Sequence, residues 1–143
     1  MKVKLIYGLT KLLVGKEYKV YFANKCQPFA SPDEGLIVLN FAAGATDESF
    51  ISHIKNRHGY RKAREISTEL WTALHEVGHT KTVGTVTYNG EVRYALELAQ
   101  KYGGDLQKIN EMYYELEDEG AATEWAIQFV KKHFILCRLI SRL

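Results

Sequence analysis

The chain has 143 residues, of which 46% are hydrophobic, 12% aromatic and 25% charged. This length and composition predict a single globular domain over residues 1–143 and exclude an intrinsically disordered chain. The 19 basic and 17 acidic residues are mixed along the chain and give a formal net charge of +2, so electrostatics give no support for nucleic-acid binding.

The first part of the chain predicts a small sheet. Residues 3–7 fit both a strand and the start of a helix, and both alternatives stay open. Residues 18–23 are rich in β-branched and aromatic side chains, which predicts a strand. Residues 24–35 carry both prolines and predict a loop, and the apolar run at residues 36–40 predicts a second strand.

Helices are predicted over most of the remaining chain. Residues 47–57 predict a short helix, and residues 61–80 predict a longer one because apolar residues recur there at helical spacing. A third helix is expected over residues 91–102, and a fourth over residues 105–133, where Asp105 is the N-cap. Strands followed by several helices indicate an α+β fold.

The cysteines and the N-terminal residues indicate the cellular compartment in which the protein is expected. Cys26 and Cys137 lie far apart without a CxxC spacing, so neither a disulfide framework nor a cysteine metal site is expected. The N-terminal apolar run is broken by glycines and a lysine, and no apolar stretch approaches membrane-spanning length. A cytoplasmic location, without membrane association, is therefore the expectation.

An HExxH sequence lies in the helix expected over residues 61–80, formed by His75, Glu76 and His79. Residues four apart project from one face of a helix, so the two imidazoles can meet one cation. At about 100° per residue, the apolar positions form one arc, and the histidines lie on the opposite side together with Thr68, Trp71 and Thr72. The histidines are therefore not expected to be core residues, although two surface histidines can also arise by chance.

A second segment places an acid where a core residue belongs. In the helix expected over residues 105–133, Glu119 lies in the middle of an apolar stripe formed by Met112, Leu116, Ala122, Ala126, Ile127 and Val130. Burying an unpaired carboxylate costs several kcal/mol, and a bound cation would remove that cost. The small residues Ala122 and Ala126 would also let this helix approach another closely.

Other interpretations of this segment stay open. Glu119 could lie at the edge of the stripe, paired with a lysine or arginine, or Gly120 could interrupt the helix and change which residues share a face. Glu115, one turn earlier, and His133 are the alternative third metal ligands.

Together, the two segments resemble the glutamate-type zincins, in particular the ImmA/IrrE family of small metallopeptidases. HExxH is followed by Glu119-x-x-Ala122-Thr123-x-Trp125-Ala126, which is similar to the family pattern ExxA(N/D)xFA. The resemblance implies a zincin-like fold, in which a small sheet with an edge strand packs on the HExxH helix and a second helix carries a ligand. It also implies one zinc ion held by His75, His79 and Glu119, with Glu76 as the catalytic base.

The resemblance covers mainly residues 66–130 and leaves residues 1–17 and 134–143 without an assigned role. Thr123 replaces the Asn or Asp that would orient a ligand histidine, but its hydroxyl can still accept a hydrogen bond from an imidazole N–H. Thr123 and Thr72 are the expected outer partners of the ligands.

Zincins of this kind place an edge strand beside the cleft, where an extended substrate adds as a further strand. The expected substrate-binding strand is Leu36, Ile37, Val38, Leu39 and Asn40. The expected partner is a protein or peptide substrate, for which a repressor or another regulator is one class. Its identity and the oligomeric state do not follow from these motifs.

Three protein ligands leave a fourth zinc position for water, which is typical of a catalytic site. Glu76 lies about 100° from His75 on the helix, so it can take a proton from that water without competing as a ligand. The expected activity is zinc-dependent hydrolysis of a peptide bond. The alternative is a zinc-binding regulatory or interaction module without proteolysis, against which the intact Glu76 argues.

The group that stabilises the oxyanion is not identified by the sequence. In a continuous helix, Tyr113 and Tyr114 would point away from Glu119, which leaves Tyr88, His58 and His133. A third hypothesis, a nucleic-acid-binding accessory protein with an accidental HExxH, is supported only by the basic residues 57–64.

Overall fold

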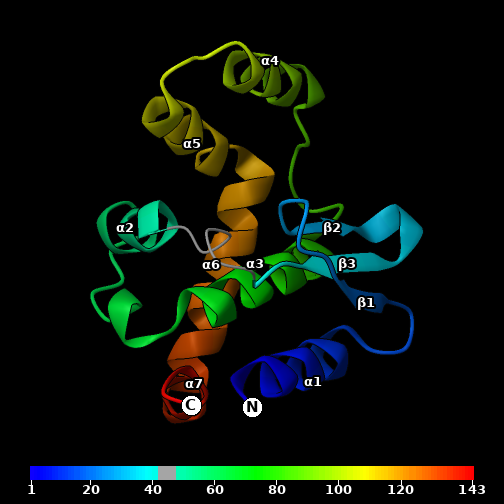
Figure 1. Cartoon of the computed structure of the whole chain (residues 1–143), viewed down its shortest axis with the longest axis vertical. Coiled ribbons are helices and arrows are strands. Elements are labelled where there is room, and N and C mark those ends of the chain that lie inside the picture. Colours follow the sequence, from blue (N-terminus) through cyan, green and yellow to red (C-terminus); the bar gives the residue numbers. More distant parts are fainter. Residues whose placement is uncertain (42–47) are drawn as a thin grey trace.

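The computed structural model of the chain describes residues 1–41 and 48–143. Its elements in chain order are α1 (Lys2–Val14), β1 (Lys19–Phe22), β2 (Phe29–Ser31), β3 (Leu36–Leu39), α2 (Glu48–Asn56), α3 (Thr68–Thr82), α4 (Gly90–Lys101), α5 (Leu106–Tyr114), α6 (Glu117–Lys132) and α7 (Phe134–Ser141). Short 3-10 turns lie at Pro32–Glu34 and Ala63–Glu65. The architecture is α+β, as the sequence predicts (Figure 1). None of the described helices is both long enough and apolar enough to cross a membrane.

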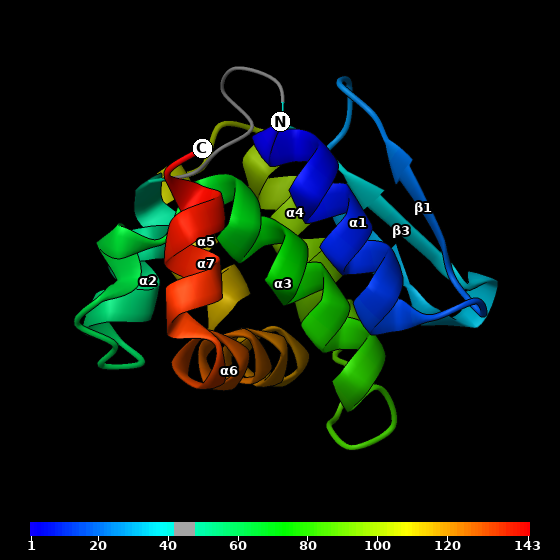
Figure 2. The ribbon, with the colours of Figure 1, turned by 90° about the horizontal axis from the view of Figure 1, so that it is seen from below.

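The central element is α3, which contacts α1, α6, α7, β2 and β3. Figure 2 shows α1 on one side of α3 and α6 on another. The helix begins at Thr68 rather than at residue 61, because Ile66 is extended and the Ser67 side chain caps the N-terminus by accepting a hydrogen bond from Leu70 N at 3.3 Å. Core contacts surround most of its circumference.

Trp71 belongs to the core and His75 is also buried, so the side of α3 opposite the predicted apolar arc is not a solvent-facing side as expected. The Trp71 side chain is fully buried, and its Nε1 donates a hydrogen bond to the Ala63 carbonyl at 2.8 Å. A helix that is buried on several sides does not divide into one apolar and one polar arc.

The sheet has the strand order β1-β3-β2, with β1 parallel and β2 antiparallel to β3. The prediction that residues 36–40 form the edge strand is therefore wrong, because β3 is paired on both sides and cannot add a substrate strand. Its uninterrupted apolar run is typical of a buried central strand. Asn40 follows β3, and its Nδ2 donates to the Cys26 carbonyl at 2.7 Å.

The edge strand beside α3 is β2, which lies inside the segment expected to be a loop. It pairs with β3 through Phe29, Ala30 and Ser31. Figure 1 shows β2 on the side of the sheet that faces α4 and α5.

The terminal segments are helical and complete the core around α3. Residues 3–7 lie in α1, which buries Ile6, Thr10 and Val14 and contacts α3 and α7. In α7, Cys137 and Ile140 are buried. The helix expected over residues 47–57 is described from Glu48 onward, and residue 47 lies outside the described residues.

The helix expected over residues 105–133 is two helices, because the chain breaks between α5 and α6. Leu116 is extended, with φ −57° and ψ 142°, and α6 begins with an acidic first turn at Glu117, Asp118 and Glu119. Met112 is consequently outside the apolar stripe and 54% exposed. The expectation that Tyr113 points away from Glu119 depended on a continuous helix, and Tyr113 instead lines the same two cavities as Glu119.

Candidate metal centre

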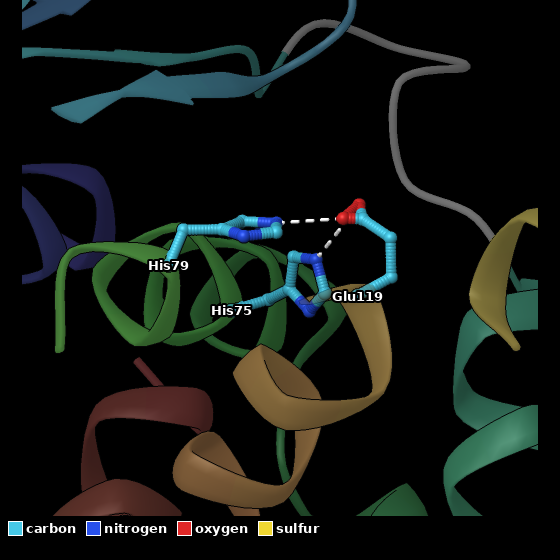
Figure 3. Close-up of side chains that lie close together, drawn as sticks. All are labelled: His75, His79 and Glu119. Atoms are coloured by element: carbon cyan, nitrogen blue, oxygen red, sulfur yellow. Dashed lines mark ion pairs between the residues drawn. The ribbon is translucent and has the colours of Figure 1, made fainter. Parts of the chain in front are cut away.

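Three side chains that commonly bind metals converge where α3 and α6 cross (Figure 3). His75 and His79 come from α3, Glu119 comes from the first turn of α6, and their ligand atoms lie within 4.8 Å of one another. Glu119 Oε1 lies 3.5 Å from His75 Nε2, and Glu119 Oε2 lies 2.7 Å from His79 Nε2. The predicted burial of the acid is confirmed, since Glu119 is 2% exposed.

The two alternative third ligands lie elsewhere. Glu115 is exposed and forms an ion pair with Arg57 at 3.2 Å. His133 follows the end of α6, and its ring centroid lies 4.6 Å from that of Phe129. Only Glu119 of the three candidates reaches the histidines.

Gly78 allows α3 and α6 to come this close. A Cβ at Gly78 would lie 2.9 Å from the Cα of Ala122 and closer still to the Ala122 carbonyl oxygen. The predicted close approach of the helix at Ala122 is confirmed, and it sets the separation between the histidines and Glu119.

The donor set fits a zinc ion. Zinc binds imidazole nitrogens and carboxylate oxygens at about 2.0–2.2 Å, so a tetrahedral site places its ligand atoms about 3.3 Å apart. The two observed separations, 3.5 and 2.7 Å, lie on either side of that value. Glu119 Oε2 is buried without an aligned hydrogen-bond donor among the described residues, although His79 Nε2 is its near neighbour. A cation bound between Glu119 Oε2 and His79 Nε2 would be a partner for both atoms.

The Glu119 carboxyl carries a negative charge. Burial alone would raise the pKa of Glu119, but the imidazoles of His75 and His79 outweigh burial and hold this pKa well below its usual range. Glu119 is therefore ionised at neutral pH and ready to act as a ligand.

Glu76 lies beside the ligands and is 7% exposed. Burial raises the pKa of Glu76, while the imidazoles of His75 and His79 oppose this shift. A carboxylate with a raised pKa is a better proton acceptor near neutral pH than an exposed one.

Thr123 contacts one of the histidines as expected, and Thr72 does not take this role. The Thr123 hydroxyl is fully buried and lies 3.0 Å from His75 Nδ1. If Nε2 bound a metal ion, Nδ1 would carry the ring proton and could donate a hydrogen bond to the Thr123 hydroxyl. Thr72 is half-buried and lines a neighbouring cavity.

Two cavities meet at the site, of about 570 and 390 Å³. The larger one runs along β2 and reaches Val83, Tyr88 and Arg93. Apolar side chains line much of the smaller one, namely Phe50, Leu96, Leu106 and Ile109. Pro28, Glu76, Tyr113 and Glu119 line both cavities.

Tyr113 and Arg93 are site residues that the sequence analysis missed. Arg93 Nη1 donates a hydrogen bond to the Tyr113 hydroxyl at 3.0 Å, and Arg93 Nη2 lies 2.6 Å from Asp118 Oδ2. Burial, followed by the charge of Glu119, raises the pKa of Tyr113, so its hydroxyl stays protonated. The acidic run at residues 117–119 indicates the start of a new helix, and with a separate helix there Tyr113 need not point away from Glu119. Arg93 belongs to no motif.

The other aromatic and histidine candidates for the oxyanion donor are placed less favourably. Tyr114 stacks on Phe50 with centroids 5.3 Å apart, and His58 Nδ1 lies 3.0 Å from Glu124 Oε2. Tyr88 lines the larger cavity but is 66% exposed.

Comparisons with protein-family models, with curated proteins and with solved structures found no match to this chain.

Proposed function

We propose that this chain is a zinc metallopeptidase of the glutamate-type zincin class, similar to the ImmA/IrrE family. His75, His79 and Glu119 are the ligands, and Glu76 is the general base. The observation that carries the proposal is the convergence of three donor atoms within 4.8 Å, two from buried residues and one from the half-buried His79, next to the buried Glu76.

Each residue has a distinct task in this reaction. A bound zinc ion would lower the pKa of a coordinated water molecule and polarise the scissile carbonyl. The Glu76 carboxylate takes a proton from the attacking water and passes it to the leaving amine. Thr123 holds the His75 ring in the orientation that directs Nε2 at the site.

The substrate is a protein or peptide bound in extended form. A regulatory protein is one class of target. Its backbone would pair with β2, because β2 is the edge strand and lines the larger cavity. The apolar side chains of the smaller cavity, including Leu96 and Ile109, favour a hydrophobic residue near the cleaved bond.

Glu76→Gln tests the proposed chemistry, because it keeps the side-chain shape and removes the base. We expect the variant to retain zinc and to cleave a random-sequence peptide mixture at least about 100-fold more slowly than the wild type, as followed by mass spectrometry. Glu69→Gln, on the same helix, is the matched control and should cleave normally. Zinc-loaded wild type that cleaves no more than Glu76→Gln would instead favour a zinc-binding interaction module.

A further inference from the structure

A hydrogen-bond donor that stabilises the negative charge developing on the carbonyl oxygen accelerates peptide hydrolysis. We propose that the Tyr113 hydroxyl, positioned by Arg93, donates this hydrogen bond. The inference rests on the proposed function and adds two residues that lie outside HExxH and its third ligand.

Tyr113 lines both cavities beside the candidate metal ligands. Both cavities share Glu76, Glu119 and Tyr113, so a substrate that passes from one cavity to the other contacts all three side chains. The fourth shared residue, Pro28, has no donor, and ionised carboxylates only accept. Among the described residues that line both cavities, Tyr113 alone offers a neutral donor.

The direction of the Arg93 hydrogen bond turns the tyrosine proton toward the site, where the Glu119 carboxylate lies within hydrogen-bonding reach and a substrate oxygen would compete for it. A guanidinium group has donors and no acceptor, so the contact of 3.0 Å between Arg93 Nη1 and the Tyr113 oxygen is donated by Arg93. The Tyr113 proton must then point to another acceptor. The positive charge of Arg93 also polarises the hydroxyl, which makes it a stronger donor.

Arg93 is itself held in place on several sides. Its side chain is 14% exposed and forms the ion pair with Asp118, which directly precedes the ligand Glu119. Its guanidinium carbon lies 4.9 Å from the ring centroid of Tyr88 and 5.1 Å from that of Tyr113. Arg93 therefore joins the tyrosine to the turn that carries the third ligand, which makes Arg93 a positioning residue.

The test compares two probes on the zinc-loaded full chain by calorimetry. A phosphonate tripeptide presents a tetrahedral anionic centre in place of the scissile carbonyl, whereas acetohydroxamate chelates the metal without such a centre. In Tyr113→Phe, we expect the phosphonate to bind about 10- to 100-fold more weakly and acetohydroxamate to bind as in the wild type. Tyr102→Phe, which alters a tyrosine that is 77% exposed, is the control and should bind both probes normally.

Arg93→Met and the double variant test whether Arg93 acts through Tyr113. Arg93→Met should weaken phosphonate binding several-fold, and adding it to Tyr113→Phe should cause little further loss, because the two effects share one hydrogen bond. Additive losses of phosphonate affinity in the double variant would overturn the role of Arg93. The affinities for phosphonate and acetohydroxamate are compared within each protein, so a variant that is only partly folded still gives a usable ratio.

The outcomes separate the two proposals. Phosphonate binding that is equal in wild type and Tyr113→Phe, or that is absent from a wild type that binds acetohydroxamate, overturns the role of Tyr113 alone. Wild-type protein that takes up no zinc overturns the proposed function and this inference with it.

Discussion

Buried polar groups define the site at the scale of single residues. Glu119 is 2% exposed and His75 is 6% exposed, so each needs a partner to offset its lost hydration. The sequence allowed His75, His79 and Glu119 to be predicted, because an HExxH spacing and an acid within an apolar stripe are local signals. The roles of Tyr113 and Arg93 were not predictable in this way, since they depend on a chain break and on a contact between residues 20 positions apart.

Thr123 and Thr72 provide a matched test of the outer contact to His75. Thr123→Val keeps the volume and removes the hydroxyl that lies 3.0 Å from His75 Nδ1. We expect the Kd for zinc to rise about 10- to 100-fold, because the imidazole loses the group that fixes its orientation. Competition with a chromogenic chelator measures this Kd.

Thr72→Val serves as the control for this prediction, since Thr72 lines the smaller cavity beside the same helix face. It should bind zinc within about twofold of the wild type, because it removes no ligand contact. Equal zinc affinity in the two valine variants would show that the Thr123 contact does not tune the site.

At the scale of elements, the crossing of α3 and α6 determines whether the ligands meet. The crossing depends on Gly78 lying directly against the backbone of Ala122. Because backbone atoms cannot rotate away as a side chain can, the spacing between the two helices tolerates little added volume.

Gly78→Ala should separate the two helices. The added methyl would meet the Ala122 backbone, so we expect the free energy of unfolding to fall by about 1–3 kcal/mol and zinc binding to weaken. Chemical denaturation of the metal-free protein, followed by a zinc titration, measures both effects.

Gly120→Ala is the control for the Gly78 prediction. A Cβ at Gly120 meets nothing within 4 Å, and alanine is favoured over glycine within a helix. This control should therefore be neutral or stabilising. A Gly78→Ala variant as stable as Gly120→Ala would show that the close crossing is not required.

The helices and the central strand were largely predictable, whereas two features of the chain were not. Three residues between prolines, Phe29–Ser31, carry too short a pattern to distinguish a strand from a loop, so β2 was missed and β3 was taken as the edge. The break at Leu116 contains neither glycine nor proline, so helical periodicity continued through it.

At the scale of the whole molecule, one set of helices packs against α3 and another set lines the site. The main hydrophobic cluster includes residues of α3 and α6, and also of α1 and α7, which lie on the side of α3 away from α4 and α5 (Figure 1). Leu96 of α4 and Ile109 of α5 are buried outside that cluster and line the smaller cavity. The terminal helices α1 and α7, to which the sequence motifs assign no role, thus pack against α3, while α4 and α5 line the site.

The central claim is that one zinc ion is bound by His75, His79 and Glu119. The most direct test is the zinc content of the purified full chain, measured by mass spectrometry beside His79→Ala, Glu119→Ala and Glu115→Ala. The account predicts about one zinc ion per chain in the wild type and in Glu115→Ala, and a loss of zinc in the other two variants. A zinc-free wild type, or wild-type zinc content in Glu119→Ala, would contradict it.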